Sequence, residues 1–418
     1  MKVLNEGLME QMLESENLRI AWKAVKSNKG AAGIDGIGVN EFIDHIRPYW
    51  ENVRTKILEG SYKPAPVKRV YIPKGKGTQR PLGIPTVQDR FVQQAMLQVL
   101  QPIFEIKFSE YSYGFRPGRS AHDAVKAAQA FVKEGKDWVV DIDLKSFFDE
   151  VNHDILMRRV SEEIKDKRML KLMGKYLRSG VLENGKVTKS AKGVPQGGPL
   201  SPLLANVYLD ALDKELETRG LSFCRYADDC NIYVRSQKSA ERVFKSVSAW
   251  IEKNLKIPIN REKSDSGRPW DRQFLGYQPT QAGTLKPSPK SVDKYKERVK
   301  KLFNGRVSLT SNQLRDVWLK YVRGWCNYFV HADEGYWRKK ISGWTRRHMR
   351  KCFWLRWHGS KGRKRNLEKL GVHPNSIKRC NLSGSSWPMA KHPAMHSALN
   401  NKRLFRLGFL VPLDFAAK

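Results

Sequence analysis

Two adjacent aspartates at the centre of a predicted β-hairpin constrain this chain more than any other feature. Tyr226-Ala227-Asp228-Asp229 lies between two short apolar runs, 221–225 and 230–234. Alternating residues on both sides of a tight polar centre are typical of a strand–turn–strand unit. Neighbouring carboxylates repel each other, and a divalent cation between them would remove that cost. A solvated turn is the alternative interpretation, because aspartate is a common turn residue.

A second acidic position is predicted at the end of an upstream strand. Residues 138–143 (Trp-Val-Val-Asp-Ile-Asp) are typical of a strand in which Asp141 and Asp143 lie on one face. An acid at the end of an apolar strand indicates a ligand role. Asp143, Asp228 and Asp229 together supply three carboxylates on two β elements, the ligand set for two-metal nucleotidyl transfer. In that reaction one metal lowers the pKa of a primer 3′-hydroxyl, and the other holds the triphosphate and stabilises the leaving oxygen.

A basic, flexible tip is predicted between two strand-like runs, 67–72 and 82–84. The tip, 74–80, contains Lys74 and Arg80. Both are suited to bind a triphosphate, Lys74 as a point charge and Arg80 through its planar, forked guanidinium. Phosphoryl transfer needs such neutralisation of the incoming nucleotide. The tip is not a Walker A loop, because the GKS/T ending is absent.

Loops punctuated by glycine and proline are predicted beside these elements. The loop 28–36 has small residues that would let a backbone approach a phosphodiester chain closely, although an ordinary connector is an equally good interpretation. A rigid turn carries Arg116 and Arg119, which we expect to point outward. A stiff loop at 193–202 leaves backbone amides open, and Gln196 within it could contact a nucleotide.

Helices are predicted for much of the remaining chain. One begins at a capping box, 86–89, and another is expected over 154–178. From residue 290 the sequence predicts further helices, whose apolar stripes we assign first to helix–helix core and second to stacking platforms. The third of these helices, 337–357, is expected to carry basic residues on its outer face: Arg346, Arg347, Arg350, Lys351 and Arg356.

Charge indicates the class of partner. The chain has 77 Lys and Arg against 42 Asp and Glu, a net charge of +35, and residues 286–418 hold 31 Lys or Arg against 7 Asp or Glu, a net of +24. Nucleic acid is the expected partner, because aromatic residues are interleaved with the basic ones. No stretch is long enough for a membrane span, the acidic N-terminus resembles no targeting peptide, and five scattered cysteines suit a reducing cytoplasm.

Short motifs follow one another along the chain in a fixed order: Asn28 to Gly36, Arg80-Pro81-Leu82-Gly83-Ile84-Pro85, Gly114-Phe115-Arg116-Pro117, Asp141-Ile142-Asp143-Leu144, Pro195-Gln196-Gly197-Gly198, Tyr226-Ala227-Asp228-Asp229, Asn260 to Lys263, Phe274-Leu275-Gly276 and Arg323-Gly324-Trp325-Cys326-Asn327-Tyr328-Phe329. This ordered set resembles a reverse transcriptase, and closely a group II intron-encoded protein of the bacterial type that lacks an endonuclease domain. Each motif alone is weak, whereas the set covers nearly the whole chain and is very specific. The last motif looks like part of a maturase domain.

The resemblance implies an α+β fold, a right-hand polymerase with fingers, a palm with an antiparallel sheet, a helical thumb and a small basic C-terminal module. The expected domains are an N-terminal extension with an RNA-contacting loop (1–40), fingers and palm (41–285), a helical thumb or maturase domain (286–360) and a basic DNA-binding module (361–418). The last segment has no metal motif and no HNH-type nuclease follows it, so cleavage of the bottom strand of a target is not expected.

The resemblance also implies roles for individual residues. Asp143, Asp228 and Asp229 are the expected catalytic residues and ligands of two Mg²⁺ ions, for which Mn²⁺ can substitute. Phe148, five residues after Asp143, matches the gate that excludes a ribose 2′-hydroxyl, although core packing is the alternative. Because this spacing starts from Asp143, Asp141 is the second choice of metal ligand. The other expected contacts are Lys74, Arg80, Gln196 and Lys263 for the nucleotide; Phe274, Leu275 and Gly276 as primer grip; and Lys29, Arg116, Arg346, Arg347 and Arg350 for RNA.

The function implied by the resemblance is RNA-directed DNA polymerisation, a nucleotidyltransferase reaction. Its substrates would be an RNA template, a DNA primer and dNTPs. The protein would also bind group II intron RNA to promote splicing, and target DNA for intron mobility. A splicing-only maturase and a host-adopted repair polymerase of the same fold are the alternatives. We expect a bacterial, nucleoid-associated cytoplasmic protein without a membrane partner, and the sequence does not set its oligomeric state.

Overall fold

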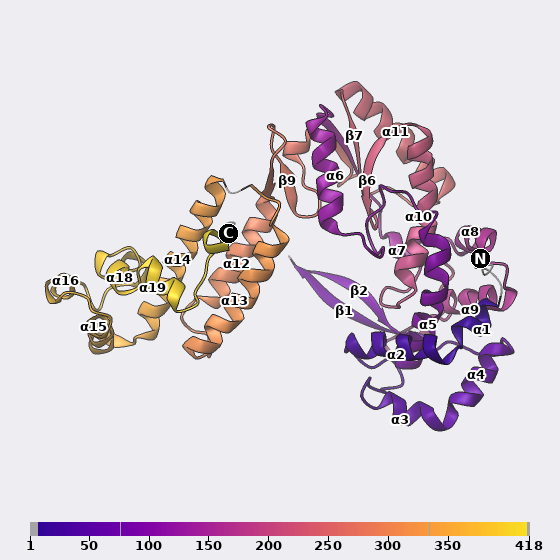
Figure 1. The fold of residues 1–418 in the computed structure, drawn as a ribbon, viewed down its shortest axis with the longest axis horizontal. Helices are drawn as coiled ribbons and strands as arrows, with labels where there is room; N and C mark the ends of the chain where they lie inside the picture. Colours follow the sequence, from indigo (N-terminus) through magenta and orange to yellow (C-terminus); the bar gives the residue numbers. More distant parts are fainter. Residues whose placement is uncertain (1–6, 76, 334, 416–418) are drawn as a thin grey trace. The chain divides into compact units, whose positions relative to one another are not determined.

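The chain folds into two compact units, Met1–Arg268 and Pro269–Lys418, each with its own hydrophobic core. The computed structural model describes residues 7–75, 77–333 and 335–415. The first unit combines helices with two four-stranded sheets, and the second is mainly helical (Figure 1). The predicted α+β class is therefore confirmed, while the finer division into four domains stays a prediction.

An antiparallel sheet forms the centre of the first unit. Its strand order is β6 (Ser222–Tyr226), β7 (Asp229–Val234), β3 (Trp138–Asp143) and β8 (Asp265–Gly267). The predicted hairpin is therefore present as β6 and β7. Asp143 lies opposite Asp229 in the register of β3 and β7, and directly paired residues project from the same face of a sheet. Helices α6 (Ala121–Lys133) and α11 (Gln237–Asn254) pack against this sheet.

A second sheet contains the predicted basic hairpin. Strand β1 (Val67–Gly75) pairs with β2 (Thr78–Ile84) on one side and with β4 (Val181–Glu183) on the other, and β5 (Lys186–Thr188) completes it. Helix α5 (Val87–Glu105) begins where β2 ends. Its predicted cap is present, because the Thr86 hydroxyl accepts a hydrogen bond from the Asp89 amide over 3.1 Å.

The remaining helices surround these sheets. They are α1 (Leu8–Met12), α2 (Ser15–Ser27), α3 (Phe42–Ile46), α4 (Trp50–Leu58), α7 (Phe147–Glu150), α8 (His153–Glu163), α9 (Lys167–Leu177) and α10 (Ser201–Thr218). The single helix predicted over 154–178 is wrong, because α8 and α9 are separate helices. Asp166 causes the break: its carboxylate accepts from the Arg168 and Met169 amides and thereby starts α9.

The second unit is built on three long helices that follow the short hairpin β9 (Tyr277–Pro279) and β10 (Leu285–Pro287). These helices are α12 (Pro289–Leu302), α13 (Ser311–Tyr328) and α14 (Tyr336–Arg356). Tyr295 and Trp318 are fully buried between them with ring centroids 5.9 Å apart. The first interpretation of the apolar stripes, helix–helix core, is thus confirmed for these residues.

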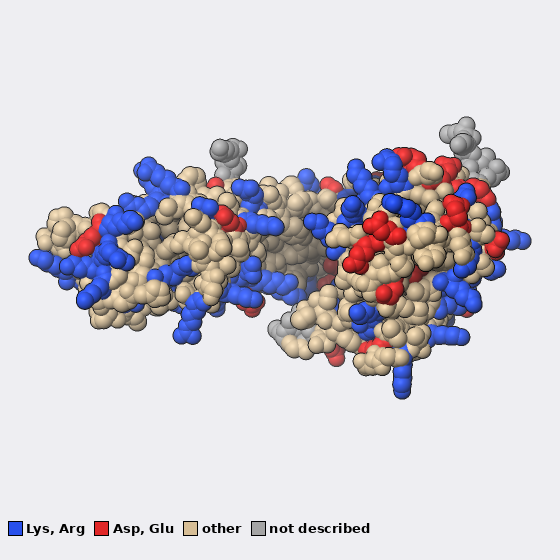
Figure 2. Space-filling model, turned by 90° about the horizontal axis from the view of Figure 1, so that it is seen from below, with Lys and Arg blue, Asp and Glu red and all other residues tan. Residues whose placement is uncertain are grey.

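Five short helices complete the second unit: α15 (Gly359–Lys369), α16 (Pro374–Lys378), α17 (Ser386–Met389), α18 (Pro393–Ala398) and α19 (Asn401–Arg406). They share one hydrophobic core with the three long helices. The face of this unit seen in Figure 2 carries many Lys and Arg and few Asp and Glu side chains. None of the helices in the described ranges combines the length and apolar character that a membrane span requires.

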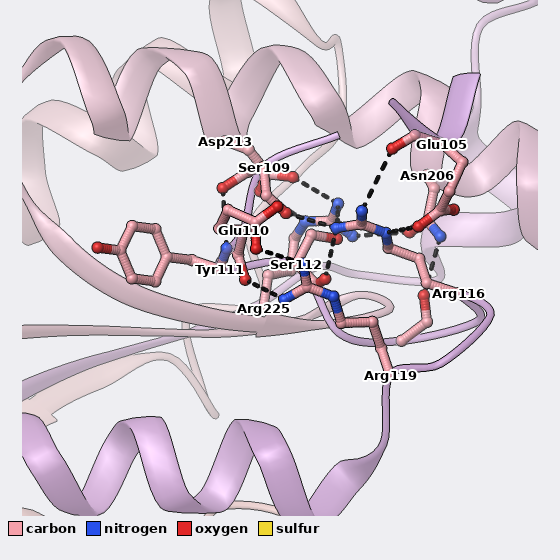
Figure 3. Close-up of polar contacts among 11 residues, drawn as sticks. Glu105, Ser109, Glu110, Tyr111, Ser112, Arg116, Arg119, Asn206, Asp213 and Arg225 are labelled. Carbon is pink, nitrogen blue, oxygen red and sulfur yellow. Dashed lines mark hydrogen bonds and ion pairs between the residues drawn. The ribbon is translucent and has the colours of Figure 1, made fainter. Parts of the chain in front are cut away.

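A buried arginine holds the β6–β7 turn in place (Figure 3). Arg225 donates to both carboxylate oxygens of Asp213 over 2.7 and 2.6 Å, to Asn206 Oδ1, to Ser112 Oγ and to the Ala227 carbonyl. All five N–H groups of the guanidinium are thereby satisfied. Burial opposes the charge of Arg225, but Asp213 outweighs it and raises the arginine's pKa.

Close backbone packing also shapes this turn. Ala227 has a φ of 58°, a left-handed conformation that is unfavourable for a residue with a side chain. Gly114 approaches the turn so closely that a Cβ atom there would lie 2.3 Å from the Ala227 amide nitrogen. Asn206 donates to the Gly114 carbonyl over 2.9 Å and fixes that approach. The Gly-Phe-Arg-Pro and Tyr-Ala-Asp-Asp motifs therefore depend on each other sterically.

Replacing Arg225 by methionine should lower the free energy of unfolding of the first unit by about 3–5 kcal/mol, because Asp213 is left buried without its partner. The double replacement Arg225→Met with Asp213→Leu should restore part of that loss. Urea denaturation followed by circular dichroism measures both. Arg19→Met, which removes only an exposed ion pair with Glu16, is the control and should change little. Equal effects of Arg225→Met and Arg19→Met would contradict the role given to the buried pair.

Candidate active site

Four aspartates interact electrostatically at the end of the β3–β7 pair. Asp143 and Asp141 come from β3, Asp229 begins β7, and Asp228 lies in the preceding turn. Burial, followed by repulsion from Asp141, Asp228 and Asp143, raises the pKa of Asp229 to about 7. The three predicted ligands are therefore gathered in one place, together with Asp141, the second choice.

This cluster fits a divalent cation by its chemistry. Carboxylate oxygens are the ligands that hard dications prefer, and the repulsion that raises the pKa of Asp229 is what such an ion would relieve. Within the described ranges, however, no three His, Cys, Asp or Glu side chains already converge as a metal-binding group. Coordination would therefore need the aspartate side chains to move closer together. The Ser264 hydroxyl keeps the strand end in place by accepting from the Asp143 amide over 2.8 Å.

Three of the predicted nucleotide contacts line one pocket of about 570 Å³ in the first unit. They are Arg80 from β2, Phe148 from α7 and Gln196 from the loop before α10. Arg80 Nε donates to Gln196 Oε1 over 3.1 Å, so the two side chains orient each other. The volume lies within the range of about 300–1,000 Å³ that is usual for small-ligand sites.

The loop before α10 takes its shape from close contact with β2. The Gly83 amide donates to the Gln196 carbonyl over 2.8 Å. Gly197 has a φ of 129°, and a Cβ atom there would lie 2.3 Å from the Gly83 carbonyl oxygen. Only glycine fits this position, which explains why a glycine follows Gln196 at the wall of the pocket.

Phe148 is 9% exposed, and its ring centroid lies 5.2 Å from that of Phe147. It therefore packs in the core and also lines the pocket, while its role as a gate against a ribose 2′-hydroxyl stays a prediction.

Of the other two predicted nucleotide contacts, the structure describes the side chain of Lys263 alone. Lys263 Nζ is 4.0 Å from Asp143 Oδ2, which places this lysine beside the acids, and it is not among the residues that line the pocket. Lys74 belongs to β1 next to the tip of the hairpin, and its side chain lies outside the described part of the structure.

The predicted primer grip forms a tight turn in the second unit. Phe274 and Tyr277 exchange two backbone hydrogen bonds of 2.9 Å. The Leu275 carbonyl accepts from the Tyr328 hydroxyl over 2.7 Å, and the Gly276 carbonyl accepts from the Ser288 amide over 2.8 Å. This turn is thus anchored on α12 and α13, whereas the aspartates and the pocket belong to the first unit.

Arg116 does not point outward, and its assignment to RNA is wrong. Its side chain is 4% exposed and forms an ion pair with Glu105 over 2.8 Å (Figure 3). It also donates to the carbonyls of Ser109 and Ser112. The turn folds back on the C-terminal end of α5, where carbonyl groups lack helical partners and attract a cation. Arg119 keeps partial exposure and bonds to Glu110.

Arg346 and Arg350 are also buried, so the prediction that they lie on the outer face of α14 and contact RNA is wrong. Arg346 donates to Asp414 Oδ1 over 2.8 Å, and Arg350 donates to the Leu399 carbonyl over 2.9 Å. Burial, together with Arg346 and Arg347, lowers the pKa of Arg350 to about 10. Both arginines attach the C-terminal segment to α14. Of the predicted RNA contacts, Arg347 remains half-buried and Lys29 is exposed.

The sequence interpretation missed several residues that line the pocket. Arg90 and Gln94 of α5 and Phe115 belong to its wall. Arg90 Nη2 donates to the Ala31 carbonyl over 2.6 Å and so connects the 28–36 loop to the pocket. Arg90 is the one basic residue of α5, next to the predicted cap, and this was the available signal for it.

Two protein families match the chain. The first match lies almost entirely in the first unit, and the second match lies within the second unit. Residues 72–279 match the family "Reverse transcriptase (RNA-dependent DNA polymerase)", and residues 292–371 match "Group II intron, maturase-specific domain". Both matches agree with the order of motifs in the sequence. The chain thus has an RNA-dependent DNA polymerase domain, a class that depends on divalent metal ions, followed by a maturase-specific domain.

Relatives agree with these matches. Protein YkfC of Escherichia coli (strain K12) is 34% identical over 299 residues, which cover 62% of this chain and 78% of YkfC. The group II intron-encoded protein LtrA of Lactococcus lactis subsp. cremoris is 30% identical over 372 residues, 72% of this chain and 60% of LtrA. The resemblance inferred from the ordered motifs is confirmed, and this chain belongs to the reverse transcriptases that carry a group II intron maturase-specific domain.

Proposed function

We propose that this chain extends a DNA primer on an RNA template with dNTPs, and that it also binds group II intron RNA to promote splicing and mobility into target DNA. The observation that carries the proposal is the register that sets Asp143 opposite Asp229, beside the Asp228 turn, in a unit that also contains the pocket of Arg80, Phe148 and Gln196. The family membership gives the reaction class. The chain spans 60% of LtrA, so its substrates and partners are part of this proposal.

The aspartates would hold two Mg²⁺ ions, with Mn²⁺ as a substitute. Bound there, the ions would activate the primer 3′-hydroxyl and offset the charge of the triphosphate. Asp143 and Asp229 are directly paired across β3 and β7, and Asp228 lies in the turn before β7. Their electrostatic coupling supports this role, because the repulsion among them is relieved when positive charge is bound.

The pocket residues would select and orient the nucleotide. Arg80 presents a planar fork, which suits phosphate oxygens, and its hydrogen bond to Gln196 limits the directions that the fork can take. The buried ring of Phe148 lines the pocket, and there it would exclude a ribose 2′-hydroxyl. Lys263 and Lys74 would add positive charge near the acids and at the hairpin tip, respectively.

The basic second unit would supply much of the nucleic-acid surface. Residues 286–418 carry a net charge of +24, and Arg347 and Lys29 keep exposure that fits contact with phosphates. Residues 274–276 would contact the primer as a grip. A nucleoid-associated position in a bacterial cytoplasm is part of this proposal, and the net positive charge supports it. A splicing-only maturase is the competing function, favoured by the same charge.

Replacing Asp228 by alanine should reduce primer extension by about 10³-fold or more, because metal coordination contributes several kcal/mol to the transition state. Extension of a DNA primer on an RNA template in Mg²⁺ measures it. RNA affinity should stay within about twofold of the wild-type value. The reason is that Lys and Arg side chains bind the phosphates, and Asp228 takes no part in those contacts. Asp44→Ala, at an exposed position on α3, is the matched control. Surviving extension would refute the metal assignment, and an inactive wild type that still promotes splicing would favour the splicing-only maturase.

Replacing Phe148 by alanine should lower the preference for dNTPs over rNTPs by about tenfold or more, measured as the ratio of kcat/KM values. The smaller side chain leaves room for the 2′-hydroxyl. Phe148→Tyr keeps the ring and should keep the preference. An unchanged ratio in a folded Phe148→Ala protein would leave core packing as the sole role of this residue.

RNA affinity should fall steeply with salt, by about 10³- to 10⁵-fold between 50 and 200 mM if six to ten phosphates are contacted. Each cation bound to a phosphate releases counterions, which produces this dependence. Fluorescence anisotropy with a labelled intron RNA measures it. RNA affinity that does not change with salt concentration would contradict binding through the basic surface.

A further inference from the structure

An exposed tryptophan lies among basic side chains in the second unit. Trp387, in α17, is 39% exposed. Arg347 and Lys351 of α14 extend over its ring, with Cζ at 5.9 Å and Nζ at 5.7 Å from the ring centroid. These two residues are four positions apart and therefore occupy one face of the helix. Trp387 and the two cations thus form a single surface, here called the Trp387 surface.

A row of aromatic rings supports Trp387 from within. The ring of His348 lies between Trp344, with centroids 4.2 Å apart, and Trp387, with centroids 5.2 Å apart. Burial, with Lys351, Lys300 and Arg347, lowers the pKa of His348 to about 4, so the imidazole is neutral at physiological pH. The row therefore adds rigid aromatic support and no further charge. A platform that is already ordered loses little entropy when a ligand binds.

The positive charge of this surface is not neutralised by the described chain. Arg346 forms an ion pair with Asp414 over 2.8 Å. By contrast, across the described ranges no Asp or Glu lies within ion-pair distance of Arg347 or Lys351. Unpaired cations next to an exposed indole attract an anion that also has an apolar face.

Another exposed aromatic residue of the same unit lacks these features. Phe405, in α19, is 52% exposed, and among the described residues no cation lies over its ring. Exposure alone is thus not what distinguishes Trp387. The combination of an indole face, aromatic support and two unneutralised cations is specific to the Trp387 surface.

This combination fits one nucleotide whose base is unpaired. A free base can stack on an indole, and its flanking phosphates can contact Arg347 and Lys351. Bases inside a duplex are already stacked, so a duplex could use the cations but not the ring. A run of acidic residues would pair with the cations but has no flat apolar group to stack on the ring.

We propose that Trp387 is a stacking platform for an unpaired base of a nucleic-acid strand, with Arg347 and Lys351 holding the adjacent phosphates. The inference rests on the proposed function only in that the partner is nucleic acid. It adds the location of a single-strand site and the chemistry by which that site distinguishes strands from duplexes.

Binding of short oligonucleotides of about eight residues to the full chain tests the platform. Labelled single-stranded RNA, single-stranded DNA and a duplex of the same length are compared by fluorescence anisotropy. Trp387→Ala should weaken single-strand binding by about fivefold or more, because base–aromatic stacking is worth about 1–3 kcal/mol. Duplex binding should change by less than about twofold. The larger loss on RNA or on DNA identifies which strand the surface takes.

Matched variants separate stacking from charge and from unfolding. Trp387→Phe should retain most of the affinity, and Phe405→Ala should have no effect. Arg347→Gln and Lys351→Gln should each reduce the slope of log affinity against log salt by about 0.7, whereas Trp387→Ala should leave that slope unchanged. Thermal unfolding identifies any variant that fails to fold.

Cross-linking of a 4-thiouridine oligonucleotide to the unaltered protein gives a test that needs no variant. The cross-link should map to the peptide that contains Trp387. Cross-links that never include this peptide would overturn the proposal. Equal losses with Trp387→Ala and Phe405→Ala, or equal losses for single strand and duplex, would also overturn it. Because these assays contain no dNTPs, a failure of primer extension would affect the proposed polymerase activity and not this result.

Discussion

The buried pair of Arg225 and Asp213 determines where the carboxylates of the site lie. Removing two charges from water is costly, and such a pair is tolerated only when every donor finds an acceptor. Arg225 meets that condition by reaching Asp213 on α10, Ser112 in a distant loop and Ala227 in the turn. The turn is consequently held by buried electrostatics and tight packing, and it does not rely on its own conformational preference, which the positive φ of Ala227 opposes.

The site beyond this pair is a region of concentrated repulsion in a strongly basic protein. Four aspartates lie at the end of the β3–β7 pair and in its turn, and Asp229 would be partly protonated near neutral pH without positive charge nearby. Such local instability is typical of functional sites, where residues are arranged for binding and not for stability. The surrounding sheet offsets this repulsion, because β3 is paired on both sides and Ser264 holds the last residue of the strand.

Features governed by local chemistry were predictable from the sequence. Alternation and turn residues predicted the hairpins, and the order of motifs identified the family. The location of arginines was not predictable in this way. Arg116 is buried by the end of α5, and Arg346 is buried by Asp414, which lies 68 positions away. An arginine on a helix has the same sequence signature whether water or a distant segment covers it, so only the tertiary structure decides. The site residues that the pocket brings together depended instead on strand ends and glycine loops, which the sequence marks directly.

The second unit has a consequence for how such proteins can vary. Trp318 donates to the Leu410 carbonyl over 2.7 Å, and Arg346 and Arg350 bond to Asp414 and Leu399. The last helices are therefore structural parts of the bundle formed by α12, α13 and α14. Natural selection can change the outward-facing residues of this segment one substitution at a time. The segment cannot readily be replaced as an independent domain, because the bundle would lose part of its hydrophobic core.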